Sequence, residues 1–228
     1  MTIFLKYLTA LILINAVLFS QTKVPFKKHL SFYTGMGIKY GITPDFNDYL
    51  IAAIPYSTSD SIKSFNAGVE FFGGLEADLS RSISGGVEYS YYVRSLTYTY
   101  SPAVFDYTII SHQPFLRLDY VIRQNNYNFK IGGAVGYHFQ HLDNRINAST
   151  TEKYSSSGPA ARLQLTFVQR LSPNFFVYLS GFGFGNFYGK LKDSNGAPLK
   201  AANSNVEASL AGYGLGARLG VQFYIAKF

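Results

Sequence analysis

The last stretch of the chain, residues 210–228, repeats with the two-residue period of a β-strand. Apolar residues share one parity, at Leu215, Ala217, Leu219, Val221, Phe223 and Ile225. Small and polar residues share the other, at Gly214, Gly216, Arg218, Gly220, Gln222 and Tyr224. Because successive side chains of a strand point to opposite faces, this strand has one apolar and one polar face. No other segment has the pattern of a helix that could cover the apolar face, so we expect this face to contact lipid.

Seven earlier segments show the pattern of strands, and the connections between them alternate in length. The segments are residues 30–41, 65–79, 83–94, 107–122, 128–140, 158–171 and 175–188, the last aromatic on both parities, so that its faces stay unassigned. Long polar connections span residues 42–63, 95–106, 141–157 and 189–205, and short turns span 80–82, 124–126 and 172–174. Short turns at one end and long loops at the other are typical of transmembrane barrels. The sequence therefore predicts an all-β fold, an antiparallel up-and-down transmembrane β-barrel of about eight strands with long extracellular loops.

Charged residues within the segments lie on the parity opposite the apolar row. An Arg or Lys on the lipid face at mid-membrane costs roughly 2–4 kcal/mol, so these charges are expected to face the lumen. The predicted lumen network is Glu70, Glu76, Glu88, Arg94, Arg117, Asp119, Lys130, Arg162, Arg170 and Arg218. Glycines alternate with them and leave room for long side chains in a narrow barrel. Either the charges pair and fill the lumen, or a pair exchanges partners to open an ion path.

Composition narrows the classes of function. The chain is 17% aromatic and 14% charged, whereas soluble domains average about 25% charged residues. It has no cysteine, which excludes disulfides and thiolate metal sites. The formal charge of +7 is dispersed without a Lys/Arg block, so we expect no nucleic-acid partner. No motif specifies a metal or a cofactor.

The N-terminus has the layout of a secretory signal peptide. Lys6 precedes an apolar run from Tyr7 to Phe19, and Ser20 is followed by Gln21. The run is shorter than the roughly 20 apolar residues of a membrane-spanning helix. We predict a signal peptide over residues 1–20 and a single barrel domain over residues 21–228.

The chain has four histidines that could act in catalysis, His29, His112, His138 and His141. His138 and His141 flank the outer end of one predicted strand, with Asp143 two residues further on. A His–Asp pair could orient a general base for a serine nucleophile in the same loop. The spacing matches no barrel-enzyme motif, so the sequence favours a protein that is not an enzyme.

The final strand also resembles the C-terminal signal strand of bacterial outer-membrane barrels. The assembly signal is carried by Arg218, Gly220, Phe223, Ile225 and Phe228. Phe228 has the parity opposite to Phe223, which predicts a bulge or a frayed end. From its N-terminus to Phe228 the chain resembles the small outer-membrane β-barrel proteins of Gram-negative bacteria, the class of the OmpA-like and OmpW-like barrels. The resemblance implies a location in the outer membrane, contact with its lipids and lipopolysaccharide, and assembly by periplasmic chaperones and the barrel-assembly machinery.

Three functions remain open from the sequence. The first is an integral outer-membrane barrel with a structural or surface-loop role, or with low-conductance passage of small solutes. The second is a lipid-modifying membrane enzyme that uses His138, His141 and Asp143. The third is a soluble lipocalin-like barrel that binds an apolar ligand, which requires the apolar parity to point inward.

Overall fold

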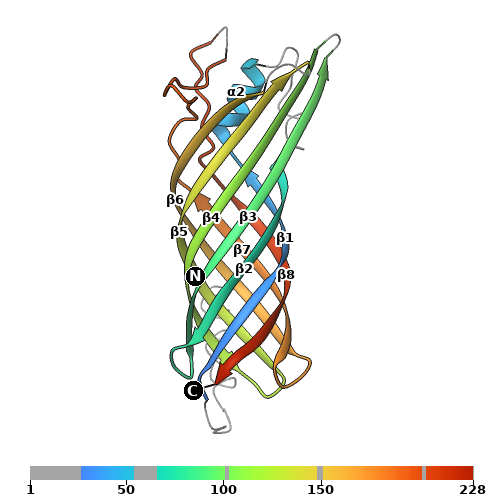
Figure 1. The fold of residues 1–228 in the computed structure, drawn as a ribbon, viewed down its shortest axis with the longest axis vertical. Helices are drawn as coiled ribbons and strands as arrows, with labels where there is room; N and C mark the ends of the chain where they lie inside the picture. Colours follow the sequence, from blue (N-terminus) through green and yellow to red (C-terminus); the bar gives the residue numbers. More distant parts are fainter. Residues whose placement is uncertain (1–26, 54–65, 101–102, 148–150, 202–203, 228) are drawn as a thin grey trace, which may run out of the picture.

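The chain forms a closed antiparallel barrel of eight strands in sequence order (Figure 1). A computed structural model describes residues 27–53, 66–100, 103–147, 151–201 and 204–227. The strands are β1 (His29–Ile42), β2 (Ala67–Asp78), β3 (Ile83–Tyr100), β4 (Ala103–Arg123), β5 (Tyr127–Ile146), β6 (Glu152–Arg170), β7 (Phe175–Asn186) and β8 (Gly212–Lys227). Each strand pairs with the next, and β8 closes the ring against β1. The predicted up-and-down barrel is confirmed.

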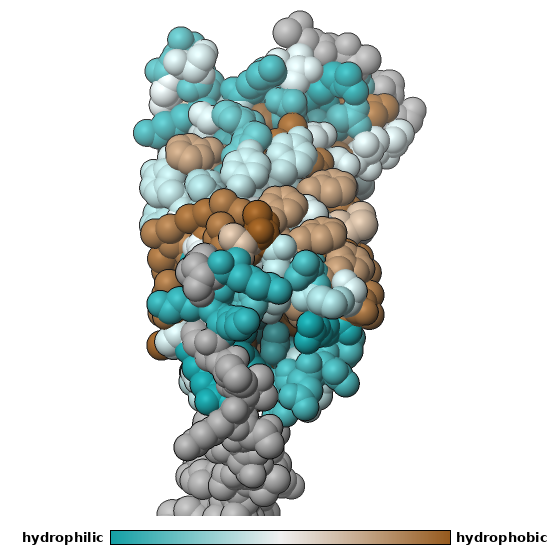
Figure 2. Space-filling view, turned by 60° about the horizontal axis from the view of Figure 1, so that its bottom comes forward, coloured by the Kyte–Doolittle hydropathy of each residue, from teal (hydrophilic) through white to brown (hydrophobic). Residues whose placement is uncertain are grey.

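The apolar parity of the strands faces outward. Leu116 is 64% exposed, Leu163 74% and Leu215 70%, whereas the chain neighbours of Leu116 and Leu163 on the other parity are buried. Figure 2 shows a brown hydrophobic band between teal hydrophilic ends. A ring of apolar side chains around a charged interior is the arrangement of a transmembrane barrel. The lipocalin-like alternative, which needs the apolar parity inside, is therefore wrong.

The four central strands are longer than their sequence pattern indicated. Strands β3 to β6 rise beyond the others at the end opposite the short turns (Figure 1). Most of residues 95–106 and much of 141–157, expected as loops, belong to these strands. The reason is that the alternation continues, since Leu96, Tyr107 and Ile109 remain on the inward parity and are buried.

A helix, α2 (Pro44–Ala53), begins the first long connection, where the sequence pattern predicted none. Pro44 is compatible with the helix, because proline at the first helical position lacks only an N–H that would have no partner there. Thr43 precedes it, and the Thr43 carbonyl accepts a hydrogen bond of 3.0 Å from the Asn47 amide. Asp45 adds a negative charge in the first turn, which the helix dipole favours.

Strand β8 has the faces that its sequence predicted. Arg218 is buried on the inside, and Leu219 is exposed on the outside. Opposite β8, Ser31 of β1 pairs with Tyr224, but Leu30 pairs with Ala226, so that one residue of β8 is skipped. The predicted irregularity is thus a β-bulge around Ile225, while Phe228 lies outside the described residues. The predicted signal peptide lies outside them as well.

Strand β7, whose faces the sequence left open, has its large rings inside. Phe176, Tyr178 and Phe182 are buried, and Leu179 is exposed. Large rings of β7 lie opposite glycines of the neighbouring strand β8, since Tyr178 pairs with Gly220 and Phe182 with Gly216. The glycines of β8 therefore provide the space that the aromatic side chains of β7 fill.

Candidate functional site

The middle of the lumen is filled by a cluster of paired charges centred on Glu88. The Glu88 carboxylate accepts hydrogen bonds from Arg162 at 2.7 Å, Arg218 at 2.9 Å and the Tyr33 hydroxyl at 3.1 Å. Arg218 also donates to Glu70 at 2.7 Å, and Lys39 lies 3.5 Å from the same carboxylate. All of these charged residues are buried. The cluster thus joins β1, β2, β3, β6 and β8 across the barrel.

A second group of charges lies nearer the short turns. Arg117 Nε is 2.6 Å from Asp119, and Lys130 Nζ is 2.5 Å from Glu76. Arg117 also approaches Glu76 at 3.9 Å and Glu88 at 4.0 Å, and so connects this group to the central cluster. Gln164 donates to Asp119 at 3.0 Å. Two cations balance two carboxylates, which leaves this group electrically neutral.

Aromatic rings fill the space between the charged side chains. The guanidinium of Arg162 lies 4.6 Å from the Phe115 ring centroid, and that of Arg218 lies 4.4 Å from the Phe72 centroid. Nearer the short turns, a buried cluster of Tyr33, Phe72, Val168, Phe176 and Tyr178 crosses the lumen. At that end Asp78 binds Arg123 at 2.5 Å and His29 at 3.2 Å. The interior is therefore packed by side chains from several strands.

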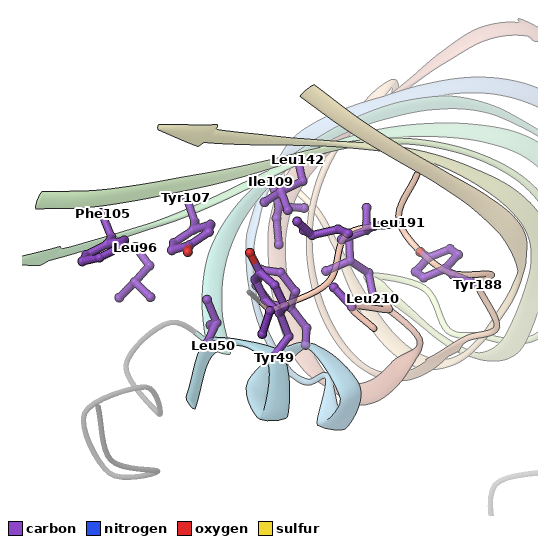
Figure 3. Close-up of a cluster of buried hydrophobic side chains, with 14 residues drawn as sticks. Tyr49, Leu50, Leu96, Phe105, Tyr107, Ile109, Leu142, Tyr188, Leu191 and Leu210 are labelled. Atoms are coloured by element: carbon purple, nitrogen blue, oxygen red, sulfur yellow. The ribbon is translucent and has the colours of Figure 1, made fainter. Parts of the chain in front are cut away.

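The opposite end of the barrel is closed by an apolar cluster, which we call the outer plug. Helix α2, residues 188–201 and residues 206–211 pack against the inward faces of β3 to β5 (Figure 3). Phe46 and Leu50 of α2 and Leu191 of the β7–β8 segment are completely buried. Tyr49 meets Tyr107 of β4 with ring centroids 6.4 Å apart, and burial raises the pKa of the Tyr49 hydroxyl. The connection expected as a polar loop over residues 189–205 instead supplies core residues.

A small polar space lies between the outer plug and the central cluster. Its volume is about 20 Å³, which is room for about one water molecule. Lys39, Arg94, Gln113 and Gln140 are among its lining residues. Arg94 donates to Thr43 at 3.3 Å, which links this space to the start of α2.

Nine of the ten predicted lumen residues lie buried inside the barrel. They are Glu70, Glu76, Glu88, Arg94, Arg117, Asp119, Lys130, Arg162 and Arg218. Arg170 differs: it is exposed at the end of β6, where its Nε donates to the Ser172 carbonyl at 3.3 Å. Its parity is inward, but β6 ends there, so the side chain reaches solvent beside the turn. Lys39 and Arg123 also have the inward parity but were not among the predicted residues. The same parity rule identifies Lys39, whereas Arg123 lies just beyond the predicted end of its segment.

The barrel wall separates His138 from the other two predicted candidates, His141 and Asp143. His138 points into the lumen, where its Nδ1 contacts the Tyr188 hydroxyl, and His141 is exposed on the outer face of the same strand. Asp143 shares the outward parity of His141, so His138 is separated from both by the barrel wall. His112 also faces outward, 2.5 Å from the Tyr89 hydroxyl. Among the described residues no group of three His, Cys, Asp or Glu side chains could hold a metal ion.

The closed ring, the apolar exterior and the charged interior together define the class of this protein. It has the fold of a small outer-membrane β-barrel, with eight strands. Within the described part of the chain, no helix has the length and apolar character needed to cross a bilayer.

Comparison with solved structures finds barrels of similar size at low sequence identity. Ail, the attachment invasion locus protein of Yersinia pestis, in a complex with the heparin analogue sucrose octasulfate, is 13% identical, with 89% of this chain and 100% of that chain covered and a TM-score of 0.46. A major outer membrane protein from Thermus thermophilus is 13% identical, with 87% and 99% covered and a TM-score of 0.48. The outer membrane protease OmpT from Escherichia coli is 11% identical, with 91% and 100% covered and a TM-score of 0.42. No protein-family model and no curated protein matches the sequence.

Proposed function

We propose that the protein is a closed, non-enzymatic barrel of the outer membrane, which stabilises the membrane and presents its long outer hairpins at the cell surface. The observation that carries this proposal is the filled lumen. Two groups of paired charges, an aromatic cluster and the outer plug together fill the interior of the barrel. A solute would have to displace buried ion pairs and rings together. Hydrogen-bonded buried charges are costly to separate, which supports a scaffold over a pore.

Low-conductance passage of small solutes is the competing role. Planar bilayers that contain the purified full chain test it, in the wild type and in Glu88→Ala. We expect no current above the lipid baseline in either protein, because the cluster of Tyr33, Phe72 and Tyr178 still crosses the lumen when the Glu88 carboxylate is lost. Stepwise currents in the wild type would overturn the closed-barrel proposal. Currents in the variant alone would show that the charge pairs form the gate.

The proposal that the protein is not an enzyme rests on the separation of His138 from His141 and Asp143. It is tested by mass spectrometry of membrane lipids from cells with and without the protein. We expect identical lipid A and phospholipid species in the two samples. A product that disappears when His141 or Asp143 is replaced would establish a lipid-modifying activity.

The apolar band on the outside of the barrel supports a location in the outer membrane. An apolar band needs hydrocarbon around it, and a barrel with a secretory signal over residues 1–20 would reach the outer membrane through the periplasm. Lipids and lipopolysaccharide would then surround the barrel, and periplasmic chaperones and the barrel-assembly machinery would insert it. Fractionation of the membranes tests the location, and truncation of residues 223–228 tests the assembly signal, since its loss should leave the chain unfolded in the periplasm.

A further inference from the structure

The membrane-facing surface contains two apolar grooves of nearly equal size. The first, of about 830 Å³, crosses β4 to β8 and is lined by Gly133, Ala161, Leu163, Gly183, Phe187 and Tyr213, among others. The second, of about 820 Å³, crosses β1 to β5 and is lined by Gly73, Leu75, Val87, Tyr89, Pro114 and Tyr137, among others. Small residues form the floor of the first groove because Gly183 and Gly185 occupy successive outward positions of β7.

The two grooves differ in the residues beyond their outer rims. Phe187 lies at the rim of the first groove, and its amide donates to the Pro159 carbonyl of β6 at 2.9 Å. Four residues further along β6, about 13 Å by the rise of a strand, Ser155 pairs with Lys192 through hydrogen bonds of 2.7 and 3.0 Å. Directly opposed residues project to the same side, so Lys192 extends outward beside Ser155. Lys153 has the same outward parity.

Both lysines have ammonium groups available to an external anion. Lys153 and Lys192 are exposed, and in the described part of the chain neither lies within ion-pair distance of a carboxylate, although Asp143 is opposite Lys153 in the β5–β6 register. At the outer rim of the second groove His112 packs against Tyr89 and Tyr91. Arg145, further out on β5, faces outward but is paired with Asp106 at 3.4 Å. Of these two grooves, and among the described residues, the first therefore combines an apolar channel with cations above it that have no carboxylate partner.

We propose that the first groove holds an acyl chain of a phosphorylated outer-leaflet lipid, lipopolysaccharide, whose phosphate groups bind Lys153 and Lys192. This inference rests on the proposed membrane orientation, in which the long hairpins face outward. The apolar lining excludes polar ligands from the groove, and hydrocarbon is the surrounding solvent at this height. A lysine near a membrane surface contributes about 1 kcal/mol of attraction to anionic lipid, or about fivefold in affinity.

The absence of tryptophan from the sequence allows a direct test. Phe187→Trp places a single fluorescent reporter at the first groove, and Tyr137→Trp places one at the second. Full-length protein is reconstituted in phosphatidylcholine with brominated chains, which quench the reporter, and lipid A is added at a low mole fraction. We expect lipid A to relieve quenching at the first groove beyond simple dilution, and at the second groove only by dilution. In the Lys153→Ala/Lys192→Ala background the relative affinity should fall about 30-fold.

A second pair of variants tests the groove itself. The Cβ of a residue that replaces Gly183 would meet the Leu215 side chain at 3.6 Å, and at Gly73 the nearest atom would be the Tyr33 carbonyl at 3.6 Å. Both sites therefore accept a side chain without a clash. Gly183→Leu should abolish the relief of quenching by lipid A at the first groove, and Gly73→Leu should leave this relief intact.

Three results would overturn the lipid site. The first is that lipid A relieves quenching equally at both reporters, and the second is that this relief persists when both lysines are replaced. The third is that a second protein copy shields the first groove from brominated lipid before lipid A is added. Quenching at both reporters without relief would remove the lipid site and leave the membrane barrel standing. No quenching at either reporter would remove the proposed function as well.

Discussion

At the scale of single residues, Glu88 has the most partners in the lumen. Its carboxylate binds Arg162 and Arg218 and accepts from Tyr33, while Ser90 donates at 3.2 Å. Fully buried guanidinium groups require such a partner, because an uncompensated charge inside a protein is expensive.

Glu88→Ala should therefore destabilise the barrel by about 3–5 kcal/mol, because it leaves two buried guanidinium groups short of negative charge. Urea unfolding in lipid vesicles measures the change. Asp106→Ala is the matched control, since Asp106 forms a more exposed pair with Arg145 at 3.4 Å and its loss should cost less than about 1 kcal/mol. Equal losses of unfolding free energy in the two variants would contradict the importance of the buried cluster.

Glycines on the inward parity are a second feature at this scale. A Cβ on Gly132 would lie 2.0 Å from the Asp119 carboxylate and 2.4 Å from the Leu118 carbonyl. Gly132→Ala should cost about 1–3 kcal/mol, because neither the paired carboxylate nor the backbone can move freely. At Gly181, on the outward parity, no atom lies within 4 Å of the added Cβ. Gly181→Ala is thus the control in the same unfolding assay, and a comparable loss there would refute the steric argument.

At the scale of elements, helix α2 and the β7–β8 segment act together as the outer plug. Phe46, Leu50 and Leu191 are completely buried between them and the wall of β3 to β5. Lys190 also binds Asp45 at 3.3 Å, but both side chains are exposed, so the apolar contacts carry most of the stability.

Phe46→Ala should loosen the outer plug by about 3–5 kcal/mol through lost burial and the cavity it leaves. We expect faster proteolysis within residues 188–201, while the membrane-embedded strands stay protected. Ile51→Ala, at a position of α2 that is 41% exposed, should leave the cleavage rate near that of the wild type. Protection of the segment in both variants would show that α2 does not hold it.

Local pattern identified the strands but not the plug. The period of two residues found all eight strands, and nine of the ten charges that it placed in the lumen are buried there, whereas Arg170 is exposed at the end of β6. Lys39 and Arg123 also have the inward parity but were not among the predicted residues. It missed α2, because a ten-residue helix after Pro44 has a weak amphipathic pattern. It also missed the outer ends of β3 to β6, because the polar outward faces of these ends are typical of loops. The ends are strands because their inward side chains pack against residues distant in sequence, such as Leu191 and Leu210.

At the scale of the whole molecule, the wall of the barrel separates an apolar exterior from a charged interior. Apolar side chains form the outer band (Figure 2), and charged side chains are enclosed by the ring of strands. The stability of this arrangement depends on hydrocarbon outside, so the effect of an outward charge should depend on its height.

Leu116→Arg, within the band, should lower stability in a bilayer by roughly 2–4 kcal/mol. Thr108→Arg lies on the same face of β4, eight residues nearer the hairpin, and should cost at most about 1 kcal/mol because it lies near the interface or beyond it. Folding titrations in vesicles give both values. If the two substitutions had the same effect, the membrane boundary would not lie between these positions.

The sequence by itself determined the class of fold, the number of strands and the direction of most side chains, because alternation along a strand is a local property that each segment carries alone. Only the tertiary structure decided which cation meets which carboxylate, how the outer plug closes the mouth, and that an apolar groove lies below Lys153 and Lys192. These features depend on the register of eight strands around a closed ring, which brings together residues as far apart as Glu70 and Arg218.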